Sequence, residues 1–197
     1  MSKTTFVVNF IGAPGCGKSI ISALIFAQLK LKHYVTEYVQ EYAKQLVWTK
    51  DFDTLNNQYY VTKHQYKLLK QIDGKVNYIV TDGPLIHGLY YNTYNPDNTS
   101  DITKTTHLIL DSHHHFRNIN IVLTRGDFAY EQEGRLQTKS EARDIDVIMK
   151  QLLKTKQINY KEFLANAEPE NIAQMVDYVL QQSVTELQSK YYFVITW

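Results

Sequence analysis

A glycine-rich segment that directly follows an apolar run constrains this chain more than any other feature. Residues 6–11 (Phe-Val-Val-Asn-Phe-Ile) have the apolar character of a buried strand, and residues 12–19 (Gly-Ala-Pro-Gly-Cys-Gly-Lys-Ser) match the pattern G-x-x-x-x-G-K-S. From Ile20 to Leu31, apolar residues recur at helical spacing. A strand, a phosphate-binding loop and a helix in this order indicate a site for a nucleoside triphosphate.

The residue types in this loop suit specific roles. Glycines let the backbone turn so that successive N–H groups point at phosphate oxygens, and the helix N-terminus adds a positive dipole. Lys18 is expected to reach the β- and γ-phosphates, and the Ser19 hydroxyl to ligate Mg²⁺. We therefore expect ATP and Mg²⁺ as cofactors, held by Gly12, Ala13, Pro14, Gly15, Cys16, Gly17, Lys18 and Ser19.

The composition suits one intracellular domain spanning residues 1–197. Of the 197 residues, 44% are hydrophobic, which is enough for an ample core. No apolar run reaches the ~20 residues of a membrane span, and the N-terminus does not read as a signal segment, so we expect a cytoplasmic protein. The single cysteine, Cys16, excludes an internal disulfide, and a small residue in a tight loop accounts for it better than an activated thiol.

Short β-rich runs alternate with helical patterns, which predicts an α/β fold with a parallel sheet covered on both faces. The expected strands are 5–11, 33–38, 76–81, 119–124 and 158–165, and 191–197 read as a sixth strand or an edge-pairing tail. The expected helices after the first are 40–48, 53–72, 85–91, 102–116, 140–154 with Ser140 as its cap, and one after Pro169. We expect a P-loop NTPase three-layer sandwich with strand order 2-3-1-4-5 and a small mobile lid over about 127–143.

Acidic residues stand at the carboxyl ends of two of the expected strands, the edge where parallel sheets gather their reactive groups. Asp82 can hold Mg²⁺ through water or accept a proton from an attacking hydroxyl; the alternative is a turn aspartate before Gly83-Pro84. Glu37, with Glu41 one helical turn later, either serves as base or sugar-hydroxyl ligand or begins a solvated helix. Glycine follows Asp82, where a Walker B run would place glutamate.

Three of the four arginines lie within one 19-residue stretch, as Arg125, Arg135 and Arg143. Guanidinium groups grip phosphate in bidentate fashion and stabilise the charge of a transferring phosphoryl group. We expect Arg135 and Arg143 to contact the transferring phosphate from the lid, and Arg125, at the end of the fourth strand, to contact the nucleotide. The alternative is a set of exposed loop arginines.

Two aromatic and histidine clusters have simpler explanations than a ligand site. The run 113–115 (His-His-His) does not predict a metal site, because consecutive helical residues point about 100° apart; it reads as a solvated helix end. Tyr59, Tyr60 and Tyr66 either stack on a base near an acceptor or pack at the edge of the core.

With these features the chain resembles the P-loop small-molecule kinases, and among them the NadR-type ribosylnicotinamide kinases and their relatives in tailed-phage genomes. Beyond the loop, the resemblance rests on 36–42 (Thr-Glu-Tyr-Val-Gln-Glu-Tyr), on Thr81-Asp82, and on 133–135 (Glu-Gly-Arg) leading into 141–144 (Glu-Ala-Arg-Asp). The last segment is also similar to the R-x-D-D lid of adenylate kinases. Gln40 stands where the family often has arginine, and the resemblance places Asn166 near adenine.

The resemblance implies an enzyme, a Mg²⁺-dependent phosphotransferase that moves the γ-phosphate of ATP to a small nucleoside- or nucleotide-like acceptor. If the chain is viral, it would act in the cytoplasm of an infected host cell. A related phage branch phosphorylates 5-hydroxymethyl pyrimidines in DNA; the net charge of +1 does not favour DNA, although a local basic groove is available. That groove would consist of Lys63, Lys67, Lys70, Lys75 and Lys104. The third alternative is a partner-activated ATPase or nucleotide switch.

Overall fold

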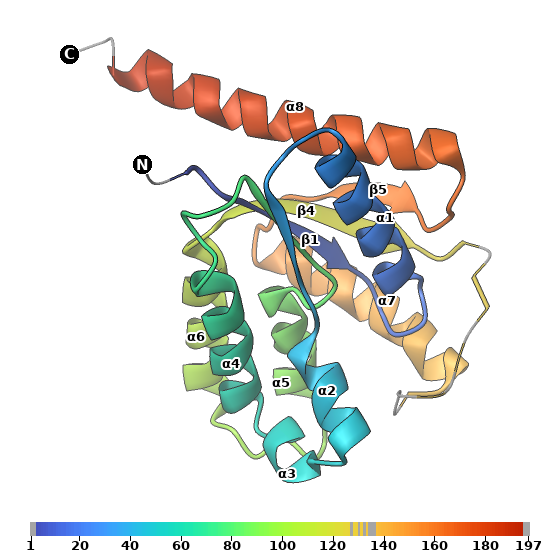
Figure 1. The fold of residues 1–197 in the computed structure, drawn as a ribbon. Helices are drawn as coiled ribbons and strands as arrows, with labels where there is room; N and C mark the ends of the chain where they lie inside the picture. Colours follow the sequence, from blue (N-terminus) through green and yellow to red (C-terminus); the bar gives the residue numbers. More distant parts are fainter. Residues whose placement is uncertain (1–2, 127, 130, 132, 134–136, 195–197) are drawn as a thin grey trace.

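The computed structural model describes residues 3–126, 128–129, 131, 133 and 137–194, with the backbone alone for Lys139 and for 189–194. The strands are β1 (Phe6–Ile11), β2 (Thr36–Val39), β3 (Tyr78–Thr81), β4 (Arg117–Thr124) and β5 (Lys161–Leu164). They pair in parallel in the order β2-β3-β1-β4-β5 (Figure 1). This confirms the predicted sandwich and its strand order.

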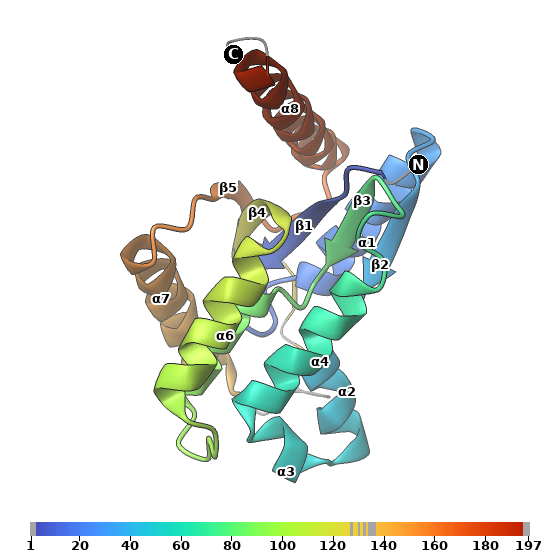
Figure 2. The same cartoon turned by 90° about the vertical axis from the view of Figure 1, so that its left-hand side faces the viewer.

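Helices cover both faces of the sheet, as Figures 1 and 2 show from two directions. They are α1 (Lys18–Leu31), α2 (Tyr42–Thr49), α3 (Phe52–Leu55), α4 (Gln58–Lys70), α5 (Gly88–Tyr94), α6 (Ile102–His114), α7 (Lys139–Thr155) and α8 (Pro169–Val194), with a 3-10 helix η1 (Leu85–His87) before α5. Helices α1 and α8 pack on one face, α4 to α7 on the other. Within the described ranges, no helix is both long and apolar enough to cross a membrane.

The two central strands are buried along their whole length. Every residue of β1 and of β3 is buried, because helices cover both faces of the sheet at these positions. One face of β1 presents Val8 and Phe10 to α1 and α8, and the other presents Val7 and Ile11 to the opposite helices. The loops at the carboxyl ends of these strands therefore begin from fully buried strands.

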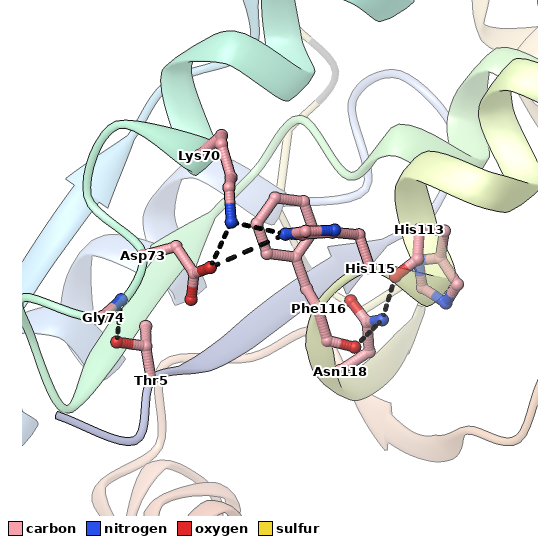
Figure 3. Close-up of polar contacts among 8 residues, drawn as sticks. All are labelled: Thr5, Lys70, Asp73, Gly74, His113, His115, Phe116 and Asn118. Atoms are coloured by element: carbon pink, nitrogen blue, oxygen red, sulfur yellow. Dashed lines mark hydrogen bonds and ion pairs between the residues drawn. The ribbon is translucent and has the colours of Figure 1, made fainter. Parts of the chain in front are cut away.

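Polar contacts join the C-terminal ends of α4 and α6 at the end of the sheet where β3 and β4 begin (Figure 3). Lys70 Nζ lies 3.0 Å from Asp73 Oδ2 and 2.6 Å from His115 Nε2. Nearby, Asn118 Nδ2 donates to the carbonyl of His113 in the last turn of α6 and to that of Phe116 just beyond the helix. These bonds join the end of α6 to the start of β4.

The histidine run 113–115 does not form one solvated helix end. His113 is only 4% exposed, whereas His114 and His115 are exposed. Burial, and then the neighbouring His114, lower the pKa of His113 to about 4. The prediction is thus wrong for His113, which turns toward the core.

Most helix bounds differ from the predictions by a few residues, and the predicted helix 85–91 is η1 followed by α5. Side-chain caps explain two further differences. The predicted helix 53–72 is split, because the Asn57 side chain accepts the N–H of Tyr60 and begins α4 anew. Helix α7 begins earlier than Ser140, since Thr138 and Glu141 form a reciprocal capping box. That box is visible in the sequence as Thr-x-x-Glu.

The predicted C-terminal strand is also wrong. Over 191–194, where the β-prone residues Tyr-Tyr-Phe-Val suggest a strand, α8 continues to Val194. Extending an existing helix adds one hydrogen bond per residue without the cost of a new nucleus, and this outweighs local β-propensity. Residues 195–197 lie outside the described residues.

Candidate functional site

The glycine-rich loop lies at the carboxyl end of β1 and leads into α1. Gly17, the N-cap of α1, has φ +94° and its Cα faces the ring of Phe128, so neither the backbone conformation nor the space accepts a side chain there. Among the described residues, no hydrogen-bond partner is seen for the amides of Gly15, Gly17 and Ser19. Three such donors at a helix N-terminus form a site for an anion.

Lys18 folds back over the loop that carries it. Its Nζ donates to the carbonyls of Gly12 at 2.7 Å and Ala13 at 3.1 Å. The ammonium group is therefore held at the first two residues of the loop.

Ser19 and Asp82 meet because β1 and β3 are neighbours in the sheet. Ser19 Oγ donates to Asp82 Oδ2 at 2.7 Å, and Asp82 Oδ1 accepts the N–H of Glu41 at 3.1 Å. Asp82 is 4% exposed. A hydroxyl and a carboxylate oxygen at one point are hard oxygen donors of the kind Mg²⁺ prefers, so the side chains present fit this ion.

The position after Asp82 admits no side chain. A Cβ added to Gly83 would lie 2.5 Å from the Cα of Glu41 and 2.8 Å from its Cβ, closer than real Cβ contacts come. The backbones of the β2–α2 and β3–η1 connections touch here. The water-activating glutamate of a Walker B run therefore has no room at position 83.

The two glutamates near β2 lie in different places. Glu37 Oε1 is 4.0 Å from Lys30 Nζ, in the last turn of α1. Lys30 lies twelve positions after Lys18 in the helix, which is about 18 Å along the axis. Glu41 instead contacts Asp82 through its backbone. The structure thus brings Glu41, and not Glu37, to the loop.

Tyr38 lies beneath the first turn of α1. Its hydroxyl is 2.7 Å from Ser22 Oγ. Burial, and then the charge of Asp82, raise the pKa of Tyr38, so the phenol stays protonated. Its hydroxyl is a neutral group close to Asp82. No motif marks Tyr38 among the fifteen tyrosines of the chain.

His87 supports the loop from the opposite side. Its Nε2 accepts the N–H of Gly12 at 3.3 Å. Burial, and then the charge of Lys18, hold the pKa of His87 well below its usual range, which keeps the ring neutral and able to accept. Sequence reasoning missed His87, since a histidine two residues into a turn carries no motif.

Arg125 contacts protein groups in this structure. Its Nε lies 2.7 Å from Oδ2 of Asp146 on α7, and its Nη2 donates to the carbonyls of Pro14 and Ala142. Sequence reasoning missed Asp146, which sits on an ordinary amphipathic helix. Arg125 is therefore linked to the loop backbone at the position where we expected it to bind nucleotide.

The remaining predicted residues surround the loop at different distances from it. Arg143 is exposed and, with Arg125 and Asp146, lines a cavity of about 250 Å³ beside Gly12. Asn166 accepts two hydrogen bonds from Asn171 Nδ2 in the β5–α8 connection, at 2.7 and 3.1 Å. Arg135 lies outside the described residues, as does part of the predicted lid.

Cys16 is enclosed by the loop. Its thiol is 2% exposed, and burial, more than any nearby charge, raises its pKa. A buried thiol of raised pKa is a poor nucleophile. The small-residue explanation of Cys16 agrees with this geometry.

Comparisons with known proteins agree with the fold. A family model described as AAA domain matches residues 7–170. No curated relative matches the sequence. Kti12 of Chaetomium thermophilum, solved in complex with ADP-AlF3, is 13% identical with a TM-score of 0.53, and the match covers 89% of this chain and 98% of Kti12. At this identity the likeness shows the fold alone.

Two further solved structures match at lower scores. APS kinase CysC of Mycobacterium tuberculosis, in complex with AMPPNP and APS, is 11% identical with a TM-score of 0.47, and the match covers 92% of this chain and 97% of that one. Shikimate kinase of Bacteroides thetaiotaomicron is 15% identical with a TM-score of 0.47, and the match covers 92% and 98%.

Proposed function

The chain belongs to the AAA domain family, and from its site we propose that it is a Mg²⁺-dependent P-loop kinase that transfers the γ-phosphate of ATP to a nucleoside- or nucleotide-like acceptor. One observation carries the proposal. Asp82 touches Ser19 of the loop, and the next position, Gly83, is closed to any side chain. The site thus has the groups for a metal-bound triphosphate, and position 83 has no room for the glutamate by which a Walker B run would direct water at it.

Each group has a role in this proposal. The loop amides and Lys18 bind the triphosphate, and Ser19 with Asp82 would hold Mg²⁺, which when bound neutralises charge on the phosphate oxygens. Asp82 or Glu41 orients the acceptor hydroxyl and takes its proton. Arg143, together with Arg135, stabilises the transferring phosphate.

An acceptor screen tests the proposal. Purified protein is incubated with Mg²⁺ and ATP, with and without a panel of nucleosides, nucleotides and ribosylnicotinamide, and ADP is measured. We expect at least one acceptor to raise ADP formation about tenfold or more, and Lys18→Ala to abolish the response. If no acceptor stimulates turnover while Lys18→Ala still removes ATP binding, the kinase proposal fails. Hydrolysis that rises only with a protein partner would identify a nucleotide switch instead.

A second candidate is phosphorylation of 5-hydroxymethyl pyrimidines in DNA. The ring of Tyr59 has Lys63 Nζ at 5.8 Å and Lys104 Nζ at 5.0 Å, and Tyr60 beside it is exposed. Aromatic rings next to cations suit a nucleic-acid strand. Labelled ATP incubated with hydroxymethylated and plain duplexes tests this candidate, and absence of label from both removes it.

A further inference from the structure

Both carboxylate oxygens of Asp146, on helix α7, accept hydrogen bonds at the loop. Oδ1 accepts the N–H of Ala13 at 2.8 Å, and Oδ2 accepts Nε–H of Arg125 at 2.7 Å. Arg125 passes the connection on to the carbonyl of Pro14 at 3.0 Å. One ion pair thus holds two successive loop residues against α7, which lies beside the loop in Figure 1.

This ion pair is largely shielded from water. The side chains of Arg125 and Asp146 are 23% and 22% exposed. Hydrogen bonds to charged groups are stronger than neutral ones, and loss of one partner leaves the other charge uncompensated. The pair is therefore a firm anchor, unlike the more exposed pair between Lys150 and Glu162, which joins the same helix to β5.

The anchor divides the loop into two parts. Asp146 occupies the N–H of Ala13, and Pro14 has no N–H, so neither residue can donate to phosphate. The amides without a hydrogen-bond partner among the described residues, those of Gly15, Gly17 and Ser19, all come later. Holding the first part fixes the direction from which the second part leaves.

We infer that Asp146 is a positioning residue for the phosphate site: it fixes Ala13 directly and Pro14 through Arg125, so that the later amides converge on the β-phosphate. Arg125 then acts on the loop rather than on the nucleotide. The same contacts link the position of α7, which carries Arg143, to the shape of the loop. The inference rests on the nucleotide-binding half of the proposed function.

Displacement of a fluorescent ADP analogue by ADP and by AMP tests the inference. ADP places a β-phosphate in the loop and AMP does not, so we expect Asp146→Asn and Arg125→Gln each to weaken ADP about tenfold and AMP less than about twofold. The double variant should be no weaker than the worse single variant, because the two side chains act as one unit. Glu162→Gln, which breaks the other ion pair of α7, should bind both nucleotides normally.

Other results would contradict the positioning role of Asp146. Wild-type affinity in Asp146→Asn, or single effects that multiply in the double variant, would overturn the positioning role and return Arg125 to direct nucleotide contact. An equal loss for ADP and AMP would show a general structural role and also overturn it. If Asp146→Asn does not fold, Arg125→Lys makes the same test, since lysine keeps the ion pair but cannot also reach Pro14. Wild-type protein that binds no ADP would overturn the proposed function as well.

Discussion

The hydroxyl of Ser19 lies 2.7 Å from a carboxylate oxygen of Asp82, although 63 positions separate the two residues in the chain. The parallel pairing of β1 with β3 brings them together, since each follows its strand at the same edge of the sheet. This contact joins the loop to the only acidic side chain that the structure buries there among the described residues. It is the strongest basis for a metal-assisted reaction.

Replacement of Asp82 by Asn is therefore expected to reduce phosphotransfer far more than it reduces folding. Asparagine keeps an oxygen for the N–H of Glu41 but loses the charge that would attract Mg²⁺. We expect activity to fall by about 100-fold or more, equivalent to roughly 3 kcal/mol, with a raised Mg²⁺ requirement. Activity measured across a Mg²⁺ titration checks this. An unchanged titration curve would remove Asp82 from the metal site.

Gly83→Ala tests the closeness of the two connections. The added Cβ would meet the Cα of Glu41 at 2.5 Å, and backbone cannot rotate away as a flexible side chain can. We expect unfolding free energy to fall by about 1–3 kcal/mol, as for other overpacked sites. Urea denaturation measures it. A midpoint equal to that of the wild type would show that the two connections separate easily.

The two glutamates give a matched pair of variants. Glu41 joins Asp82 through its backbone, whereas Glu37 lies toward the far end of α1 beside Lys30. We expect Glu41→Gln to lower acceptor-stimulated turnover by about tenfold or more, and Glu37→Gln to change it less than about twofold. Steady-state kinetics with the acceptor found in the screen decides between them. The reverse result would restore Glu37 as the acceptor-side carboxylate.

The sequence predicted the fold well because its signals are local. The loop motif and the buried strand before it identify β1 and α1, and alternation of strands and helices then leaves few topologies. The predictions of one helix over 53–72 and of a C-terminal strand are wrong, because in each case a second local effect outweighs the pattern on which the prediction rests. At Asn57 a side-chain cap interrupts an apolar pattern, and over 191–194 an existing helix overrides β-propensity.

The sequence predicts only those site residues that belong to a motif or stand directly after an expected strand. Lys18, Ser19 and Asp82 follow strands at recognisable positions, so their neighbourhood could be foreseen. His87 and Asp146 bind loop amides from elements that no motif marks, and their roles depend on packing between distant segments. The sequence predicts Glu37 because it ends the expected strand 33–38, and no local pattern shows that the β2–α2 turn brings Glu41 to Asp82 instead.

His113 gives a pH-dependent prediction for stability. Its pKa is about 4 in the folded protein, against an ordinary value of 6.5, so between these values the unfolded chain binds the proton more readily. Stability therefore rises with pH through this window, and acidification from pH 6.5 to pH 4 should cost about 3 kcal/mol through this residue.

Within the described residues Nδ1 of His113 has no hydrogen-bond partner, so His113→Leu removes the titration without breaking a bond there. Denaturation of both proteins from pH 4 to pH 7 should show the variant losing less stability on acidification, while contributions from His87 and the carboxylates cancel in the difference. Parallel pH profiles for the two proteins would mean that His113 is protonated in the folded state or that its ring leaves the core.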